Sequence, residues 1–226
     1  MGELELQSPR PTLVVVGGAS KMSEADLNRV RSLFVKVLAP LVEELGAFVV
    51  DGGTDAGVMQ TIGQARAQIG GTFPLIGVTP VGKVPLGDRV PTSEDTGLEP
   101  NHSHFVLIPG SNWGDESPWI VSVATVLASG APSLTVLVNG GEISKKDVAE
   151  NLKANRRVIA IAGSGRLADQ IAAALRGEAT EDIVKELVAS GLVQAIDMNE
   201  SFDRLSREIK EIFEAGGDRS RIAFLK

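Results

Sequence analysis

Short apolar runs alternate along the chain with longer segments in which apolar residues recur every three or four positions. The short runs are rich in Val, Ile and Leu and nearly free of charge, which is typical of strands buried on both faces of a parallel sheet. They cover residues 12–17, 47–51, 74–80, 105–109, 134–139, 157–163 and 193–197. The pattern therefore predicts seven strands.

Between the strands, the three-to-four periodicity predicts amphipathic helices. The first runs from Ser23 to Leu45, and Pro40 should kink it or split it in two, because proline cannot donate the backbone hydrogen bond of a continuous helix. The later helices are expected at 55–69, 114–129, 145–154, 166–176, 181–190 and 202–215. This alternation predicts the α/β class, with a Rossmann-like, doubly wound, mainly parallel sheet and helices on both faces.

The alternating pattern covers residues 12–218, which we interpret as one domain between two short tails, residues 1–11 and 219–226. One long connection, residues 81–101, has no periodicity. A loop of that length in a compact domain is usually functional or mobile.

The C-terminal tail contains three apolar side chains, Ile222, Phe224 and Leu225. An apolar tail of this kind docks either on its own domain or on a partner subunit. Both alternatives stay open, and the second would make the protein a homo-oligomer.

No charged residue occurs between Ser117 and Gly141. Gly130 and Pro132 divide this stretch into a helix-like part and a strand-like part, each too short to cross a bilayer. We interpret both parts as buried core, with Trp119 packed inside, and expect no association with a membrane.

The charge balance narrows the class of partner. The formal net charge is −7 and no run of Lys or Arg occurs, which argues against a surface for nucleic acid or for an anionic membrane. The absence of cysteine excludes disulfides, thiol catalysis and cysteine-based zinc sites. Such a composition suits the cytoplasm, and the acidic, polar start of the chain does not resemble a secretory signal. We therefore expect a cytoplasmic protein with a small-molecule ligand.

Five of the predicted strands end in a glycine-bearing turn. In open α/β sheets, ligands bind where strand ends meet helix starts, because glycine permits close backbone approach and free N–H groups attract anions. The candidate ligand-binding residues in these turns are Gly17, Gly18, Gly52, Gly53, Thr54, Gly57, Gly110, Trp113, Gly114, Asp115, Glu116, Asn139, Gly140, Gly163, Ser164, Gly165 and Arg166. One such turn is explained by a tight connection alone, whereas five favour a pocket for a phosphate-bearing ligand. Neither the Walker lysine motif nor a clean GxGxxG is present, so ordinary nucleotide hydrolysis and standard dinucleotide binding are not expected.

Arg166 follows Gly-Ser-Gly at the expected first turn of a helix. A guanidinium there could grip phosphate through two parallel hydrogen bonds. The alternative is a surface arginine that pairs with Asp169, three residues later. We favour the ligand, because a cation at the positive end of a helix is otherwise unfavourable.

Aromatic, acidic and histidine side chains add further candidates. Trp113, beside a glycine loop, is a candidate for stacking on a base. Asp115 and Glu116 lie at the expected start of a helix, where a carboxylate either binds ribose hydroxyls, stabilises a glycosidic cleavage or simply caps the helix. His102 and His104 have no third ligand at metal spacing. We therefore expect no metal, and expect both rings to bond loop backbone and shape the pocket.

Five segments resemble a known family when taken in order: DGGTDAGVMQTIG, LIGVTP, LEPNHSHFVLI, VLVNGG and AGSGRLAD. They look like the prokaryotic branch of the SLOG superfamily, which is similar to the cytosolic N-terminal domain of melastatin-type TRP channels. The resemblance implies a Rossmann-like fold and a binding or sensing role toward a nucleotide or ADP-ribose-like ligand, with no certain cofactor. It also implies that the phosphates are lined by Gly52, Gly53, Thr54, Gly57, Val58 and Met59, and faced by Gly163, Ser164, Gly165 and Arg166.

A sister branch, the LOG-type phosphoribohydrolases, implies an alternative. These enzymes cleave the N-glycosidic bond of nucleoside monophosphates with a GGGxxGLM turn, an arginine and a PGGxGTxxE motif. The segment from Gly52 to Met59 resembles the first turn, and PGSNWGDE resembles the second without its Gly-Thr pair, which would make Glu116 the catalytic carboxylate. The catalytic Arg-Lys pair has no clear counterpart, and Lys83 and Arg89 are the nearest basic residues.

Overall fold

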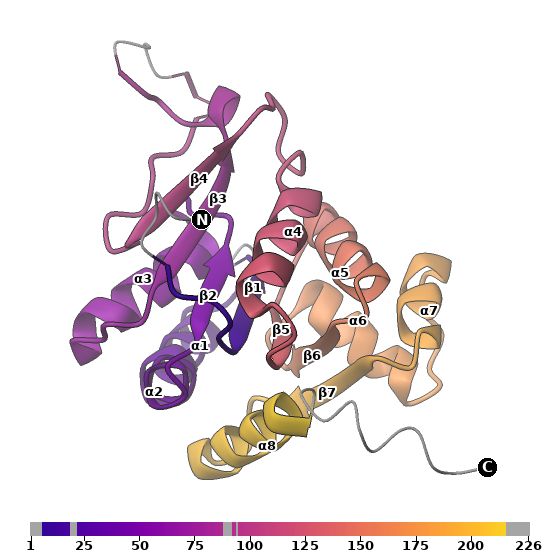
Figure 1. Cartoon of the computed structure of the whole chain (residues 1–226). Coiled ribbons are helices and arrows are strands. Elements are labelled where there is room, and N and C mark those ends of the chain that lie inside the picture. Colours follow the sequence, from indigo (N-terminus) through magenta and orange to yellow (C-terminus); the bar gives the residue numbers. More distant parts are fainter. Residues whose placement is uncertain (1–5, 19–21, 88–91, 94, 216–226) are drawn as a thin grey trace.

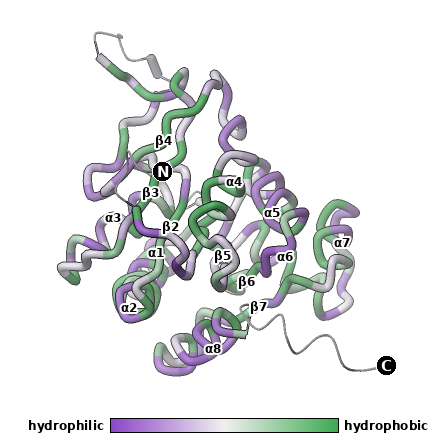
Figure 2. Tube along the Cα trace, viewed as in Figure 1, coloured by the Kyte–Doolittle hydropathy of each residue, from purple (hydrophilic) through white to green (hydrophobic). Residues whose placement is uncertain are grey.

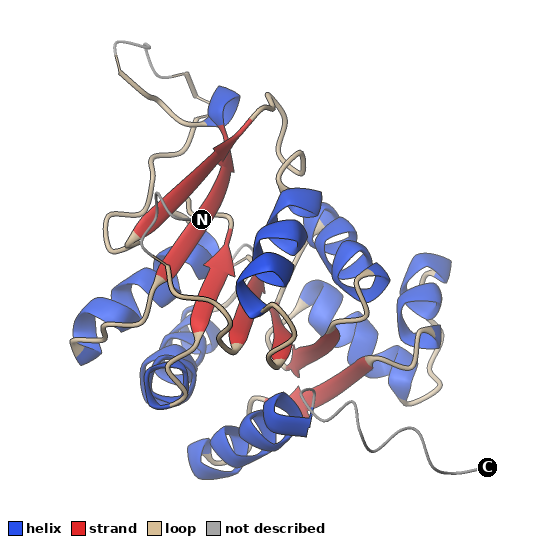
Figure 3. Cartoon of the chain, viewed as in Figure 1, coloured by secondary structure: helices blue, strands red, loops and turns tan. Residues whose placement is uncertain are grey.

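The computed structural model describes residues 6–18, 22–87, 92–93 and 95–215 of the chain. Seven strands form one sheet (Figure 3), in the order β4-β3-β2-β1-β5-β6-β7, and every neighbouring pair is parallel. The strands are β1 (Thr12–Gly17), β2 (Phe48–Asp51), β3 (Leu75–Pro80), β4 (His104–Ile108), β5 (Ser133–Val138), β6 (Arg157–Ala162) and β7 (Val193–Asp197). The predicted Rossmann-like α/β fold with a parallel sheet is confirmed.

The strand order reverses between β1 and β5. The chain moves outward from β1 to β4 and then returns to pair β5 with the other side of β1, in a register that sets Gly17 opposite Val138. All carboxyl ends share one edge of the sheet because all strands are parallel. The helices that leave β1 and β5 depart on opposite faces, so a crevice opens at this edge.

Helices cover both faces of the sheet (Figure 1). One layer contains α1 (Glu24–Leu33), α2 (Ala39–Glu44), α3 (Gly57–Ile69) and α8 (Phe202–Ala215). The other contains α4 (Ser117–Ala128), α5 (Glu142–Lys153), α6 (Arg166–Leu175) and α7 (Asp182–Ala189). Successive strand residues alternate between the two cores: Val15 packs with the first layer and Val14 with the second, as the period of two requires. Figure 2 shows apolar colour along the strands, whereas α8 carries both colours.

The first predicted helix is divided at Pro40, as expected. A π-helical stretch, Phe34–Leu38, separates α1 from α2, and Pro40 lies in the first turn of α2. Pro40 has no N–H to donate to the carbonyl four residues earlier, and its ring would clash with that carbonyl. The wider π turn removes this conflict without breaking the helical path.

The interpretation of residues 117–141 as buried core was wrong for the outer face of α4. Trp119 is 46% exposed and Val126 is 52% exposed, whereas Ile120 and Ala124 face the sheet. The helix belongs to an outer layer, so only one side of it can contact the sheet, however apolar its sequence. It also begins at Ser117 rather than at residue 114.

The structure describes residues 6–11 of the N-terminal tail and none of the C-terminal tail, residues 219–226. The Ser8 hydroxyl and the Arg10 N–H both donate to the carbonyl of Leu127 at the end of α4, and the Arg10 guanidinium lies 5.4 Å from the centroid of the Phe48 ring. The apolar C-terminal positions 222, 224 and 225 lie outside the described residues. Among the described helices, none has the length and hydropathy needed to cross a membrane.

Candidate functional site

A cavity of about 520 Å³ opens at the carboxyl edge of the sheet, at the switch point between β1 and β5. Its wall is formed by β1, the turn after β2, the start of α3, the long loop between β3 and β4, the loop before α4, the first turns of α4 and α6, and the first two turns of α5. The lining residues are Val15, Val16, Gly17, Gly18, Gly52, Thr54, Ala56, Met59, Thr96, Trp113, Glu116, Ile120, Gly141, Glu142, Ile143, Ser144, Asp147 and Arg166.

The structure brings eight of the candidate residues to this wall: Gly17, Gly18, Gly52, Thr54, Met59, Trp113, Glu116 and Arg166. The other candidates do not line it: Gly53, Gly57, Val58, Gly110, Gly114, Asp115, Asn139, Gly140, Gly163, Ser164 and Gly165. All of these lie one to three residues from a lining residue, and their contacts show that several hold the turns in place.

Gly17 ends β1 opposite Val138 of β5. Its φ is 138°, and a Cβ at this position would overlap the carbonyl oxygen of Val138. Only glycine permits this close approach. The Gly18 N–H then donates to the same carbonyl at 3.2 Å, so the backbone turns tightly into the cavity.

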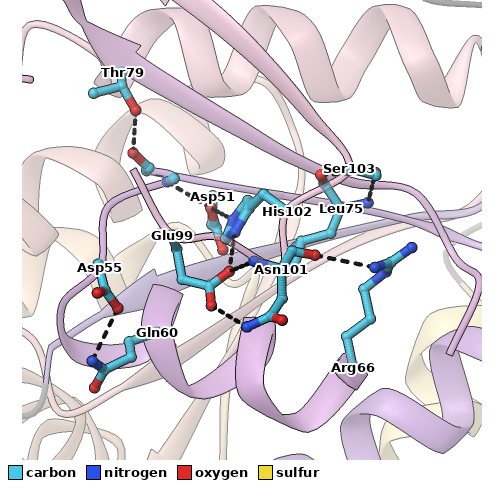
Figure 4. Close-up of polar contacts among 12 residues, drawn as sticks. Asp51, Asp55, Gln60, Arg66, Leu75, Thr79, Glu99, Asn101, His102 and Ser103 are labelled. Atoms are coloured by element: carbon cyan, nitrogen blue, oxygen red, sulfur yellow. Dashed lines mark hydrogen bonds and ion pairs between the residues drawn. The ribbon is translucent and has the colours of Figure 1, made fainter. Parts of the chain in front are cut away.

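The turn after β2 is fixed from below by side chains of the sheet. The Gly53 N–H donates to Asp51 Oδ1 at 2.7 Å, and the Thr79 hydroxyl donates to the carbonyl of Gly52 at 2.6 Å (Figure 4). Thr54 pairs with Leu98 in an antiparallel bridge, which joins the long loop to the same turn. These bonds hold Gly52 and Thr54 at the cavity wall.

His102 lies beneath this turn, between two buried carboxylates (Figure 4). Its Nε2 is 2.9 Å from Asp51 Oδ1 and its Nδ1 is 2.8 Å from Glu99 Oε2. Burial lowers the pKa of His102, but the charges and hydrogen bonds of Asp51 and Glu99 outweigh burial and raise it. His104 bonds the Ser103 hydroxyl at 2.8 Å. The prediction that both histidines bond loop backbone was wrong, because side chains occupy these positions.

The three side chains of this cluster do not form a metal site. Each nitrogen of the imidazole faces a different carboxylate, so the groups share hydrogen bonds and do not converge on one point. In the part of the chain that the structure describes, no group of three or more His, Asp or Glu side chains could hold a metal ion.

The Gly-Ser-Gly turn after β6 is fastened to the turn after β5. The Asn139 N–H donates to Ser164 Oγ at 2.7 Å, and the Asn139 amide donates to the carbonyl of Ser164 at 2.8 Å. The Gly163 N–H donates to Asp169 Oδ1 at 2.6 Å. Asn139, Ser164 and Asp169 therefore hold the two turns together and position the residue that follows them.

That residue is Arg166, which begins α6 and lines the cavity. Its φ is +50°, a left-handed conformation that is costly outside glycine and is typical of functional sites. Its guanidinium lies against Gly141, where an added Cβ would come within 2.8 Å of Nη2. Gly141 thus leaves room for the guanidinium beside the N-terminus of α5.

The loop before α4 contributes Trp113 and Glu116 to the wall. Trp113 is half-buried, and the Lys83 ammonium nitrogen lies 5.9 Å from its ring centroid. Glu116 is 7% exposed and accepts the Gly114 N–H at 2.8 Å. Burial raises the pKa of Glu116, and its backbone hydrogen bonds offset only part of that effect.

Asp115, the neighbouring candidate, caps the loop. Its Oδ2 accepts the N–H groups of Ser111 and Asn112, both at 3.0 Å, and these hydrogen bonds lower the pKa of Asp115. It points its carboxylate into its own turn and does not line the cavity.

Sequence reasoning missed the face of α5, which contributes Glu142, Ile143, Ser144 and Asp147. Asp147 is 8% exposed, and burial raises its pKa to about 7. The signal was the spacing of Ile143 and Asp147, four residues apart on one side of a helix. The helix was expected to begin at residue 145, whereas it begins at Glu142, so the prediction left Ile143 outside the helix and did not place it on the same face as Asp147.

Comparison with known proteins agrees with the fold. The family model described as "SLOG in TRPM, prokaryote" matches residues 10–206. A transient receptor potential cation channel subfamily M member-like 2 protein of Nematostella vectensis is 26% identical over 98% of this chain, which spans only 16% of that channel's length.

Two solved structures share the fold. A molybdenum cofactor binding protein of Rippkaea orientalis is 17% identical, with a TM-score of 0.55, and the match covers 91% of this chain and 99% of that one. The molybdenum cofactor carrier protein of Chlamydomonas reinhardtii is 18% identical, with a TM-score of 0.55 and coverage of 90% and 98%. At such identities the likeness is one of fold. The family match over most of the chain shows that the protein belongs to the prokaryotic SLOG domains related to those of TRPM channels.

Proposed function

We propose that the protein binds a nucleotide-derived ligand of the ADP-ribose type in the cavity at the carboxyl edge of the sheet. The observation that carries the proposal is the position of Arg166. Its guanidinium lies against Gly141 at the start of α5, on a wall that also contains the glycine turns after β1 and β2. Backbone N–H groups, helix N-termini and a planar cation are together suited to phosphate.

The rest of the wall is suited to the non-phosphate part of such a ligand. Trp113 offers a ring for a base to stack on, and Glu116 offers a carboxylate to ribose hydroxyls. Val16 and Ile120 add apolar surface. The wall therefore has one part suited to phosphate and another suited to a sugar or a base, and a ligand with a charged end and a sugar or base at the other end matches both. The protein would act in the cytoplasm as a sensor or carrier of that ligand.

The first test is Arg166→Ala, measured by calorimetry with AMP and with adenosine. A charge-assisted contact is worth roughly 1.5–3 kcal/mol, so the affinity for AMP should fall by about ten- to a hundredfold, and that for adenosine should change little. Arg166→Lys should keep only part of the wild-type affinity for AMP, because an ammonium group lacks the planar, forked set of donors of a guanidinium.

Arg176→Ala is the matched control, since Arg176 follows the same helix and pairs with Glu178 far from the cavity. It should bind AMP as the wild type does. Equal weakening of AMP and adenosine by Arg166→Ala would mean that the arginine shapes the cavity without reading phosphate. If AMP, ADP-ribose and molybdenum cofactor all fail to bind the wild type, the proposal is wrong as a whole.

A hydrolase of the phosphoribohydrolase type is the second candidate. The observation in its favour is that Glu116 is buried at the cavity wall with a raised pKa, next to Trp113, which Lys83 contacts. A carboxyl of this kind is suited to glycosidic cleavage. Arg89, the other basic candidate, lies outside the described residues. Release of free base from a nucleoside monophosphate, abolished by Glu116→Gln, would support the enzyme over the sensor.

A further inference from the structure

One buried carboxyl group borders the cavity with a hydrogen-bonding position unfilled. Asp147 lies in the second turn of α5, is 8% exposed, and lines the cavity. Its Oδ1 has no hydrogen-bond partner among the described residues. A buried carboxyl group without a full set of partners costs stability, so its presence at a cavity wall favours a ligand that donates a hydrogen bond to it. Oδ1 itself is inaccessible, so a ligand in the cavity would meet the Asp147 carboxyl group through Oδ2.

The position of Asp147 along α5 separates it from the arginine. Asp147 lies six positions after Gly141, against which the Arg166 guanidinium lies, and this corresponds to a rise of roughly 9 Å along the helix axis. Val16 and Ile120 add apolar surface to the same cavity wall. A ligand whose phosphate lies at Arg166 would therefore place a different group at Asp147.

The charged groups around Asp147 define what that group must be. Burial raises the pKa of Asp147 most, and the charge of Glu116, on the loop before α4, raises it further. The Ser117 hydroxyl, which is nearby but has no partner in hydrogen-bond geometry, and Lys146 lower it, and the net result is about 7. Glu142 and Arg166 also line the cavity. A second anion beside Glu116 and Asp147 would be repelled, whereas a hydroxyl or amino group would donate to the carboxylate without adding charge.

We infer that Asp147 is a specificity-determining residue, which selects ligands by a hydroxyl or amino group that donates to its carboxylate from the end opposite the phosphate. The inference rests on the proposed function and adds a residue to it. It predicts that phosphate alone does not satisfy the cavity, and that a ribose hydroxyl or the amino group of a base completes it.

The pH dependence of binding follows from this contact. The donor group bonds the ionised carboxylate, so ligand binding favours loss of the Asp147 proton, and affinity should rise as the pH increases through about 7. ADP-ribose is the probe, because the two phosphate groups of its diphosphate bridge stay ionised over this range. Glu116 and Arg166 are present in every variant compared, so a rise of affinity with pH that survives in Asp147→Asn would come from them and not from Asp147.

The experiment compares Asp147→Asn with the wild type by calorimetry between about pH 6 and pH 8. At the upper pH the variant should bind ADP-ribose at least about tenfold more weakly and should lose the rise with pH, because an amide cannot ionise. Inorganic pyrophosphate should bind both proteins equally. Asp147→Ser is the second variant, with the same expected loss of pH dependence, and Asp182→Asn, on the exposed side of α7, is the control.

The source of the donor group is found with three nucleotides. These are AMP, AMP without its 2′-hydroxyl, and AMP without its 6-amino group. One of the two modified nucleotides should bind the wild type and Asp147→Asn with the same affinity, and the group that this nucleotide lacks is the donor. If Asp147→Asn binds ADP-ribose with wild-type affinity and pH profile, the inference is overturned while the proposed function stands. If neither ADP-ribose nor pyrophosphate binds the wild type, the proposed function fails and this inference with it.

Discussion

Asp147 and Glu116 are carboxyl groups in surroundings that favour their neutral forms. Both are buried, both line the cavity, and each lies close enough to other charges for its pKa to respond. Arg166 is the opposite case, a cation with a left-handed backbone conformation between the Gly-Ser-Gly turn and the rest of α6. These three residues are unfavourable for stability, and such residues concentrate at sites that bind ligands.

The carboxyl of Asp147 should make stability depend on pH. A pKa of about 7 replaces an ordinary value of 3.8, so the contribution of Asp147 to folding is complete below pH 3.8 and is lost as the pH rises to about 7. Asp147→Asn removes this loss. Near pH 8 the variant should therefore be more stable than the wild type, by at most about 4 kcal/mol, with the difference vanishing toward pH 4.

Urea denaturation at a series of pH values measures this difference. His102 also has a raised pKa, so its own contribution is complete below pH 6.5 and is lost above that value as the pH rises. Both proteins carry His102, so the comparison cancels its effect. A constant difference between variant and wild type over the whole range would contradict the raised pKa of Asp147.

At the scale of elements, α3 approaches the long loop more closely than an ordinary helix allows. Glu99 in that loop is 1% exposed and accepts hydrogen bonds from the backbone N–H and the amide of Asn101, at 2.9 and 2.6 Å, while facing His102. Its carboxylate lies directly over Gly63, in the middle of α3, where an added Cβ would overlap it. The glycine lets helix and loop pack together beneath the turn after β2.

Gly63→Ala should therefore destabilise the protein by at least about 2 kcal/mol, although alanine is favoured over glycine in a helix by roughly 1 kcal/mol. The cause is displacement of Glu99 from its partners, which leaves a buried carboxylate without its hydrogen bonds. Gln64→Ala, on the exposed side of the same helix, should be close to neutral. Equal stability of the two variants in thermal unfolding would contradict this prediction, because it would show that the loop containing Glu99 can move away from an alanine at position 63 without loss of stability.

At the scale of the whole molecule, the site works against the net charge of −7. A general attraction for anions is absent, so affinity for a phosphate ligand must come from the backbone N–H groups and the arginine at the switch point. The fold supplies this point because the sheet grows outward from β1 in both directions. The cavity lies between the two halves of the sheet, so a bound ligand contacts elements from both.

Ligand binding should therefore stabilise the whole domain. At a free concentration of about one hundred times the dissociation constant, ADP-ribose should add about 2.7 kcal/mol, which corresponds to a rise in Tm of roughly 5–10 °C for a domain of this size. Arg166→Ala should lose most of this rise at the same concentration. A ligand that binds by calorimetry but leaves the Tm unchanged would bind the unfolded chain as well as the folded one.

The sequence by itself determined the fold and the edge of the sheet that carries the site. Seven apolar runs alternate with amphipathic segments, and this pattern depends only on local periodicity, so the strands and helices could be predicted within a few residues. The glycine turns marked the carboxyl edge for the same reason, since the conformations that need glycine are local. The division of the first helix at Pro40 follows from the missing N–H of one residue.

Only the tertiary structure decided which residues meet at the cavity. Burial of Asp147, exposure of Trp119, and the contact of Glu99 with Gly63 each depend on elements far apart in the chain. Side-chain periodicity gives the face of a helix but not the layer that covers it, so an apolar outer face and a buried acid look alike in sequence. The pKa of a carboxyl depends on desolvation and on neighbouring charges, and both exist only once α4, α5 and the sheet have packed together.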